Sequence, residues 1–513
     1  FISLAFRYQD FYVFREFNAD KAHQLHGAYQ LLQGNGVSLE SYDLNTLQAH
    51  QRPLIAWPPA YSYLVAGASK ISGLSVFEAS WAVDVLTLAA LWCVLLWLSL
   101  LLRFTLLQTA ILFVLFGLCR TPWVYLWSAD IIGTVLFLYS AALNVSFIQQ
   151  KGTQWTSVRF AFLQFILIGT MVFLKYSLFP VYTSLCLSVF SFSWKAEKKH
   201  YRMGIMLAAT IFVLLGLLLL YNKTLTNHAT EMGSRYRKGL FFENLLMFNA
   251  FLFHAFIYLE GIMQRMQSYW LQYFLQILNA VFVAFILFHL GKKMLAGKAD
   301  YFSHLVFWTT VSVCSFLAFL SVYYPQEVFV GTYHWTYVKE LHYFSSAAFL
   351  LTIYLIRNFH MQVPRTIFAF LAFAFIGLAA VYGLGLTTYY TLTKNRAASF
   401  ENMIGHAMKA NEFIRKHQDS NTYFLSLTGN QAVDAQVLSI AAINGAKVTF
   451  NYDGFFPDEY LAPLFTKQKT FPPGKKIIVY LESNMRVVDS LLPGLAHHIE
   501  QNQDGQNFLV VNP

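Results

Sequence analysis

Long apolar windows separated by polar connections dominate the pattern of this 513-residue chain. A helix needs about 20 mostly apolar residues to cross the roughly 30 Å hydrocarbon layer of a bilayer. Ten windows predict membrane-spanning helices, at about 77–102, 105–120, 131–148, 158–174, 177–194, 203–221, 270–290, 303–322, 343–357 and 366–386. The pattern therefore predicts a multi-spanning α-helical membrane protein. Composition agrees, because 57% of the residues are hydrophobic and only 12% are charged.

The basic residues near these windows are sorted by side. Five short connections between alternate pairs of windows carry them: Arg103; Lys151 and Arg159; Lys195, Lys198, Lys199 and Arg202; Lys292, Lys293 and Lys298; Arg357 and Arg365. Because successive helices alternate in direction, all five connections fall on one side, which the positive-inside rule makes cytoplasmic. Membrane topology thus accounts for the net charge of +10, and nucleic acid is not expected as a partner.

The long polar segments all fall on the opposite, extracytoplasmic side, so any chemistry is expected there. They include a first external loop at 7–76, a middle loop at 222–269 and the tail. The chain starts with Phe1 rather than Met, and residues 1–6 look like the end of a further apolar segment. We therefore expect an upstream helix running from inside to outside.

The tail differs from the rest of the chain in composition. Stretches at 422–427, 447–450, 476–481 and 508–511 are strand-like, and 432–443 is helical. This alternation predicts a small extracytoplasmic α/β domain at 391–513, after a transmembrane domain at 1–390. The tail has no Gly-rich phosphate loop and no nucleophile elbow, so we expect it to cover the membrane site or to hold an acceptor.

The first external loop contains two predicted helices. Residues 20–33 are helical in character and end at Gly34-Asn35-Gly36. A second apolar helix opens at Trp57-Pro58-Pro59, where proline suits the first helical turn, and runs to about Gly73. Its length is short for a membrane span and favours a position in the interface.

These loop sequences resemble the polytopic GT-C glycosyltransferases, the group that includes protein O-mannosyltransferases and aminoarabinose transferases. The resemblance rests on Asp20 before a helix that ends in Leu31-Leu32-Gln33-Gly34-Asn35-Gly36, and on the Trp57-Pro58-Pro59-Ala60-Tyr61 sequence. It rests further on Thr121-Pro122-Trp123 leading to Asp130, on Met232-Gly233-Ser234-Arg235-Tyr236-Arg237, and on Glu340-Leu341-His342-Tyr343-Phe344. Many relatives have arginine where this chain has His342, and a neutral imidazole cannot replace a permanent guanidinium.

The resemblance implies a hexosyl- or pentosyltransferase that uses a polyprenyl-phosphate-linked sugar and inverts its anomeric configuration. The acceptor would be an extracytoplasmic glycan, lipid or protein, reached beside membrane lipid in a bacterial inner (plasma) membrane. Such a transfer needs a base for the acceptor proton and positive charge for the departing phosphate. Asp20 is the predicted base, and Asp130 would orient the acceptor or a metal. The predicted substrate-binding residues are Arg235, Arg237, Lys238, Lys175, His342, Glu340 and Trp57.

Plainer readings stand beside these roles. Asp20 and Asp130 are each placed to stabilise a helix start, and the basic cluster at 235–238 suits anionic headgroups. Lys175 fits a snorkelling lysine, and Trp57 fits an interfacial aromatic belt.

A metal site has little support in the sequence. His23 and His26 share a helix face but have no matched pair elsewhere, which favours surface polarity over ligation. No cofactor is assigned, and a divalent cation stays open because some relatives of this type need one.

A transporter or flippase of a lipid-linked glycan is the alternative function. It would be expected to show broken helices in two repeated halves, and no such repeat is present in the sequence. A membrane scaffold that displays the tail is a third choice, since it needs neither the acidic loop positions nor the basic cluster.

Overall fold

The computed structural model describes most of the chain in separate stretches. These are residues 19–42, 48–55, 57–118, 128–149, 154–195, 200–226, 269–323, 328–330, 333–335, 341–359, 367–393, 398–426, 428, 431–449, 474–481, 497–503 and 505–511. The chain forms two compact units, and each is described by itself. A helical unit comprises residues 1–13 and 84–394, and a mixed unit comprises residues 14–83 and 395–513.

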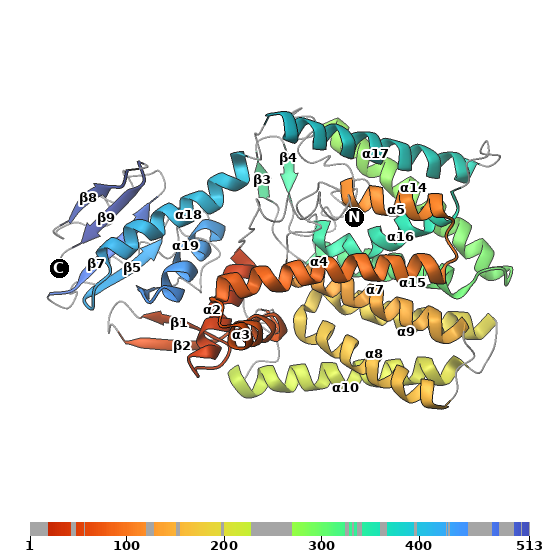
Figure 1. Ribbon diagram of the computed structural model, residues 1–513, viewed down its shortest axis with the longest axis horizontal. Helices are drawn as coiled ribbons and strands as arrows, with labels where there is room; N and C mark the ends of the chain where they lie inside the picture. Colours follow the sequence, from red (N-terminus) through yellow and green to blue (C-terminus); the bar gives the residue numbers. More distant parts are fainter. Residues whose placement is uncertain are drawn as a thin grey trace. The chain divides into compact units, whose positions relative to one another are not determined.

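All ten predicted windows are helical in the structure (Figure 1). The helices are α4 (Val76–Leu101), α5 (Leu106–Leu118), α7 (Ser128–Gln149), α8 (Gln154–Leu174), α9 (Phe179–Lys195), α10 (Tyr201–Thr226), α14 (Tyr269–Leu295), α15 (Tyr301–Tyr323), α16 (Ser345–Arg357) and α17 (Ile367–Thr393). Short 3-10 helices, η1 (Tyr176–Leu178) and η5 (Leu341–Phe344), precede α9 and α16, and β3 (Val328–Val330) pairs with β4 (Tyr333–Trp335). Among the described residues, six helical segments are long and apolar enough to cross a membrane, and α5, α8, α16 and α17 contain shorter apolar segments. The chain is an integral membrane protein of the predicted multi-spanning class.

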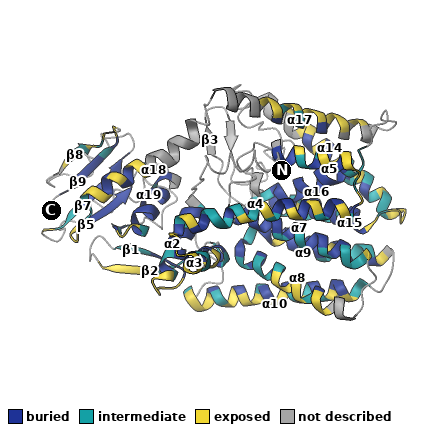
Figure 2. Ribbon diagram, in the orientation of Figure 1, coloured by how far each residue is buried: buried dark blue, intermediate teal, exposed yellow. Residues whose placement is uncertain are grey.

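The helical unit has buried inner helices and exposed apolar side chains on its outer helices, as expected for a protein surrounded by lipid. Every residue of α16 from Ser345 to Ile356 is buried (Figure 2). Large apolar side chains on the outer helices are exposed instead, among them Phe212 at 76% and Val381 at 71%. Because such exposure is costly in water, these outward faces are the ones that lipid covers.

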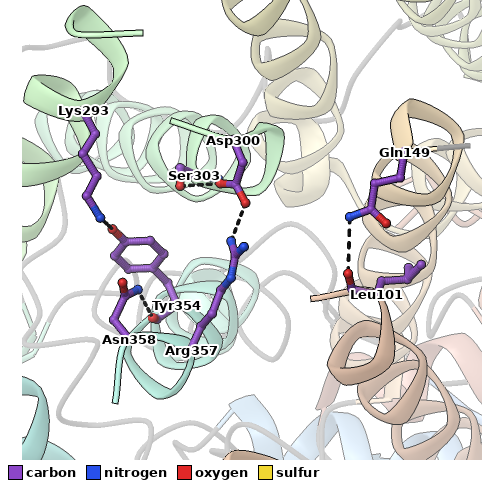
Figure 3. Close-up of polar contacts among 8 residues, drawn as sticks. All are labelled: Leu101, Gln149, Lys293, Asp300, Ser303, Tyr354, Arg357 and Asn358. Carbon is purple, nitrogen blue, oxygen red and sulfur yellow. Dashed lines mark hydrogen bonds and ion pairs between the residues drawn. The ribbon is translucent and has the colours of Figure 1, made fainter. Parts of the chain in front are cut away.

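The last turns of several helices and the turn before α15 meet at one end of the helical unit, which we call the basic end. Figure 3 shows contacts among its residues, including Lys293, Asp300 and Arg357. Gln149, at the end of α7, donates a 3.3 Å hydrogen bond to the carbonyl of Leu101, at the end of α4. Gln108 of α5 donates to the carbonyl of Arg357 at 2.9 Å, and Arg357 forms an ion pair with Asp300, just before α15. Helix ends that the sequence assigns to one side of the membrane thus lie close together, and the side itself stays a prediction.

The mixed unit contains the predicted α/β tail. Its five-stranded sheet has the order β6-β5-β7-β9-β8, from β5 (Thr422–Ser426), β6 (Lys447–Val448), β7 (Lys476–Leu481), β8 (His497–Gln501) and β9 (Asn507–Val511). The β5 strand is parallel to β6 and β7, whereas β9 is antiparallel to β7 and β8. Two helices, α18 (Ala398–His417) and α19 (Gln431–Ile443), pack against each other, and Phe413 of α18 stacks on Phe508 of β9 at 3.8 Å.

Elements of the first external loop complete the mixed unit. They are α2 (Ala19–Leu32), the hairpin of β1 (Ser38–Tyr42) and β2 (Ala49–Pro53), and α3 (Ala60–Ser72). Gly34 and Gly36, both at positive φ, follow α2, and Gly73 ends α3 with a φ of 72°, a conformation that glycine adopts without strain. The α2 helix packs against α3, β1 and α19. The loop helix that carries Asp20 thus shares a core with the tail.

Candidate functional site

A buried ion pair joins two of the predicted site residues in the helical unit. Lys175 Nζ donates to Asp130 Oδ2 at 2.7 Å, and the two side chains are only 10% and 7% exposed. Asp130 lies in the first turn of α7, where the helix dipole favours a negative charge. Lys175 lies between α8 and η1 with extended backbone, φ −160° and ψ 135°. The break between these helices places a lysine beside the start of α7.

Tyr343 and the start of α16 complete the surroundings of this pair. The ammonium of Lys175 lies 5.4 Å from the centre of the Tyr343 ring, within the range of a cation–π interaction. Thr134, one turn after Asp130, bonds to the hydroxyls of Ser345 at 2.8 Å and Ser346 at 3.3 Å. The first turns of α7 and α16, with the break before η1, therefore form one polar site, which we call the ion-pair site.

Close packing fixes the geometry of the ion-pair site. Gly133 lies where an added Cβ would collide with the side chain of Leu178 in η1. The hydroxyl of Tyr176, next to Lys175, accepts a 2.6 Å hydrogen bond from Asn222 of α10, whose side chain is buried. Neither η1 nor the lysine can shift without disturbing a neighbouring helix.

The other predicted site residues are distributed differently. Arg235, Arg237, Lys238 and Glu340 lie outside the described residues, and so does the side chain of His342, whose backbone belongs to η5. Asp20 and Trp57 belong to the mixed unit. The expected convergence of Asp20 with Asp130 joins residues of different units and stays a prediction.

Asp20 lies in the first turn of α2, a helix with an unusually polar buried face. Its neighbours Lys21, Gln24, His26 and Gln30 are all less than 9% exposed. Ser62 of α3 donates to the carbonyl of Gln24 at 2.8 Å, which ties the two loop helices together. The carboxylate of Asp20 is itself half-buried.

The two histidines of α2 correct a sequence prediction. The expectation of surface polarity was wrong, because α3, β1 and α19 cover this helix, so that His26 is fully buried and His23 is half-buried. Burial lowers the pKa of His23 from 6.5 to about 4. Burial, with a smaller effect of His23, lowers the pKa of His26 to about 3. Both imidazoles are therefore neutral at pH 7.

Trp57 is held beside the first turns of α2. Its ring centre lies 5.2 Å from that of His23, and it packs against the apolar cluster of Val37, Leu39 and Leu54. His23 follows Asp20 by three residues, so the two share a helix face. Asp20, His23 and Trp57 thus form a partly exposed group within the mixed unit.

A metal ion finds no prepared site in the part of the chain that the structure describes. No three His, Cys, Asp or Glu side chains gather there in an arrangement able to hold one. The ion-pair site holds one carboxylate, Asp130, which is bonded to the ammonium of Lys175.

The order of helices, the loop elements and the tail together form a fold that is also present in solved proteins. Two crystal structures of ArnT from Cupriavidus metallidurans are similar to this chain in fold. The apo structure matches with a TM-score of 0.51 and 10% identity, over 97% of this chain and 94% of ArnT. The structure bound to undecaprenyl phosphate matches with a TM-score of 0.51 and 12% identity, over 96% and 93% of the two chains. No protein-family model and no curated protein sequence matches the chain.

Sequence reasoning identified Asp130 and Lys175 separately and missed their neighbours. Tyr343 stands within the Glu340–Phe344 stretch that carried the family resemblance, so the motif contained a usable signal. Thr134, Ser345 and Ser346 gave none, because hydroxyl residues are common in apolar helices, where they bond to backbone or to one another.

Proposed function

We propose that this protein is a membrane glycosyltransferase that moves a sugar from a polyprenyl-phosphate-linked donor to an extracytoplasmic acceptor. The observation that carries the proposal is the fold, which matches ArnT over nearly the full length of both chains, including the structure bound to undecaprenyl phosphate. The ion-pair site adds a chemical reason, because a buried ammonium is a strong ligand for a phosphate oxygen.

In the proposed reaction the acceptor hydroxyl attacks the anomeric carbon of the donor sugar. The bond between that carbon and the phosphate oxygen breaks on the opposite face, and polyprenyl phosphate leaves with the bonding electrons. Asp20 takes the acceptor proton as general base. The result is transfer with inversion, and the atoms and charges balance.

Lys175 would hold the phosphate as negative charge develops on it, and Asp130 would keep the ammonium charged and in place. The stacking of Lys175 on Tyr343 restricts the ammonium further. Positive charge of Arg235, Arg237 and Lys238, with Glu340 and His342, would complete the donor site. Trp57, held by His23 and the apolar cluster, offers a ring face to the sugar.

Turnover of purified protein tests the proposal. The donors would be undecaprenyl-phosphate-linked hexoses and aminoarabinose, and the readout is release of undecaprenyl phosphate together with transfer of labelled sugar. Asp20→Asn is expected to lower kcat by roughly 10²–10⁴-fold and to leave the affinity for undecaprenyl phosphate unchanged. Lys175→Gln is expected to weaken that affinity.

Glu78→Gln is the matched control, because Glu78 is also a carboxylate in the first turn of a helix and also belongs to the mixed unit. It is exposed, and it accepts hydrogen bonds from the backbone N–H of Ser75 at 3.0 Å and from the Ser75 hydroxyl at 2.8 Å. Wild-type turnover by Asp20→Asn would refute the role of Asp20. Movement of an intact lipid-linked glycan without bond cleavage would support the flippase alternative instead.

We further place the basic end in the cytoplasm and the tail outside the bacterial inner membrane, following the positive-inside rule. In a background with the four native cysteines replaced by serine, Lys298→Cys should react with a membrane-impermeant maleimide only after cell lysis. Lys416→Cys, at an exposed position of α18, should react with the same maleimide in intact spheroplasts. The reverse pattern would overturn this orientation.

A further inference from the structure

Among the described residues of the basic end there is one carboxylate, Asp300, and there are more cations than it can neutralise. Asp300 Oδ1 accepts hydrogen bonds from the backbone N–H of Ser303 at 3.0 Å and from its hydroxyl at 2.6 Å. Asp300 Oδ2 accepts from Arg357 at 2.5 Å (Figure 3). Asp300 is therefore committed to Arg357 and Ser303, and the charges of Asp300 and Arg357 cancel.

Three lysines at the end of α14 add further positive charge to this end. Lys292 and Lys293 lie in its last turn, and Lys298 lies in the turn that follows. Lys293 is half-buried, and its Nζ donates to the hydroxyl of Tyr354 at 3.4 Å, 5.9 Å from the ring centre (Figure 3). Among the described residues, no carboxylate lies within ion-pair distance of these three ammonium groups. A half-buried ammonium that shares its nearest carboxylate with an arginine favours binding of an anion.

The surface around these lysines indicates whether the anion is a free ion or the headgroup of a lipid. Phe288, Lys292 and Leu295 follow one another at helical spacing on an exposed stripe of α14. Phe288 is 72% exposed and Leu295 is 77% exposed, so both offer apolar surface directly beside the lysines. A free inorganic anion gains nothing from contact with an apolar surface. A phospholipid would place its phosphate on the lysines and its acyl chains along the stripe.

We propose that the end of α14 binds the headgroup phosphate of an anionic phospholipid, with Lys293 and Tyr354 at its inner wall and Lys292 and Lys298 at its rim. The Asp300–Arg357 ion pair connects the start of α15 to the end of α16 beside this site. It therefore fixes the neighbouring helices and adds no net charge to the site. The inference is independent of sugar transfer and holds for any activity of the chain.

Lipid binding to the intact protein tests the proposal. Protein reconstituted in nanodiscs of phosphatidylcholine, with or without phosphatidylglycerol, would be compared by native mass spectrometry and thermal midpoint. Phosphatidylglycerol should stay bound and raise the midpoint. Each lysine near a membrane surface contributes about 1 kcal/mol to such binding, so Lys293→Gln should weaken it roughly fivefold and Lys292→Gln/Lys293→Gln roughly 25-fold.

Two controls keep the result specific. Lys223→Gln removes an exposed lysine from the last turn of another apolar helix, α10, and should leave phosphatidylglycerol binding unchanged. Lys293→Arg should restore binding, which separates lost charge from lost folding. Equal retention of phosphatidylcholine, or wild-type binding by the double glutamine variant, would overturn the proposal. Full reproduction of the midpoint shift by inorganic phosphate would show a phosphate site without a lipid requirement and would overturn it as well.

Discussion

Removing one partner of the buried Lys175–Asp130 pair should destabilise the helical unit strongly. In Lys175→Met the carboxylate of Asp130 stays at a position that is 7% exposed, so water cannot replace the lost ammonium. Breaking such a pair from one side costs about 3–5 kcal/mol. An exposed pair would cost at most about 1 kcal/mol. The low exposure of both side chains therefore decides that the larger value applies.

Replacing both partners should recover most of that loss. Lys175→Met/Asp130→Leu leaves no buried charge and keeps similar volumes, and such replacements are often neutral. The cycle of wild type, two single variants and double variant should thus be strongly non-additive, with the double variant losing far less stability than the sum of the two single losses. Asp130→Asn is the conservative single variant, because it preserves shape while removing the negative charge.

Unfolding of the four proteins in mixed detergent and SDS micelles, followed by circular dichroism, measures these differences. Single variants that lose less than about 1 kcal/mol would refute the burial of the pair. The double variant also separates stability from function. It should be as stable as wild type and yet bind undecaprenyl phosphate weakly, and unchanged binding would refute the proposed role of Lys175.

Three further predictions concern packing, pH and buried polar groups. Gly133→Ala should cost about 1–3 kcal/mol through collision with Leu178, and Leu178→Ala in the same chain should recover part of it; additive losses in thermal unfolding would contradict the contact. Because His26 stays neutral to about pH 3 while an unfolded histidine protonates near pH 6.5, stability should fall as pH decreases through this range, by about 2 kcal/mol at pH 5 relative to pH 8. His26→Gln should flatten that dependence in denaturation curves, and an unchanged slope would show that other groups cause it. Gln164→Leu removes the amide that bonds to Asn144 at 2.9 Å and to Ser140, so it should lower the thermal midpoint by more than an exposed Lys223→Gln does.

The membrane helices were predictable because lipid imposes a simple rule on their composition. Each of the ten windows became a helix, and the tail strands at 422–426 and 476–481 were also recognised from their apolar residues. The β8 strand was missed because His497–Gln501 contains a single apolar residue, Ile499, and is a strand only through its pairing with β9. The β1–β2 hairpin escaped for the same reason, since β2 (Ala49–Pro53) is mostly polar and largely exposed.

The candidate site was predictable in its members and not in their pairing. Asp130 and Lys175 were each identified from a position near a helix end, but their contact depends on the break at η1 and on the packing of α7 with α8. The burial of His26 could not be predicted either, because α19, which helps to cover it, comes from the far end of the chain.

That packing of α2 against α19 sets an order for biogenesis. As the chain is synthesised, the segment that carries Asp20 emerges early, and its partner α19 follows only after the whole helical unit. Until then the buried polar face of α2 lacks part of its cover, and contacts between such distant segments form slowly. The loop that carries Asp20 is therefore fully packed only after the tail has been synthesised, so a chain that ends before α19 would contain the helical unit and leave α2 partly uncovered.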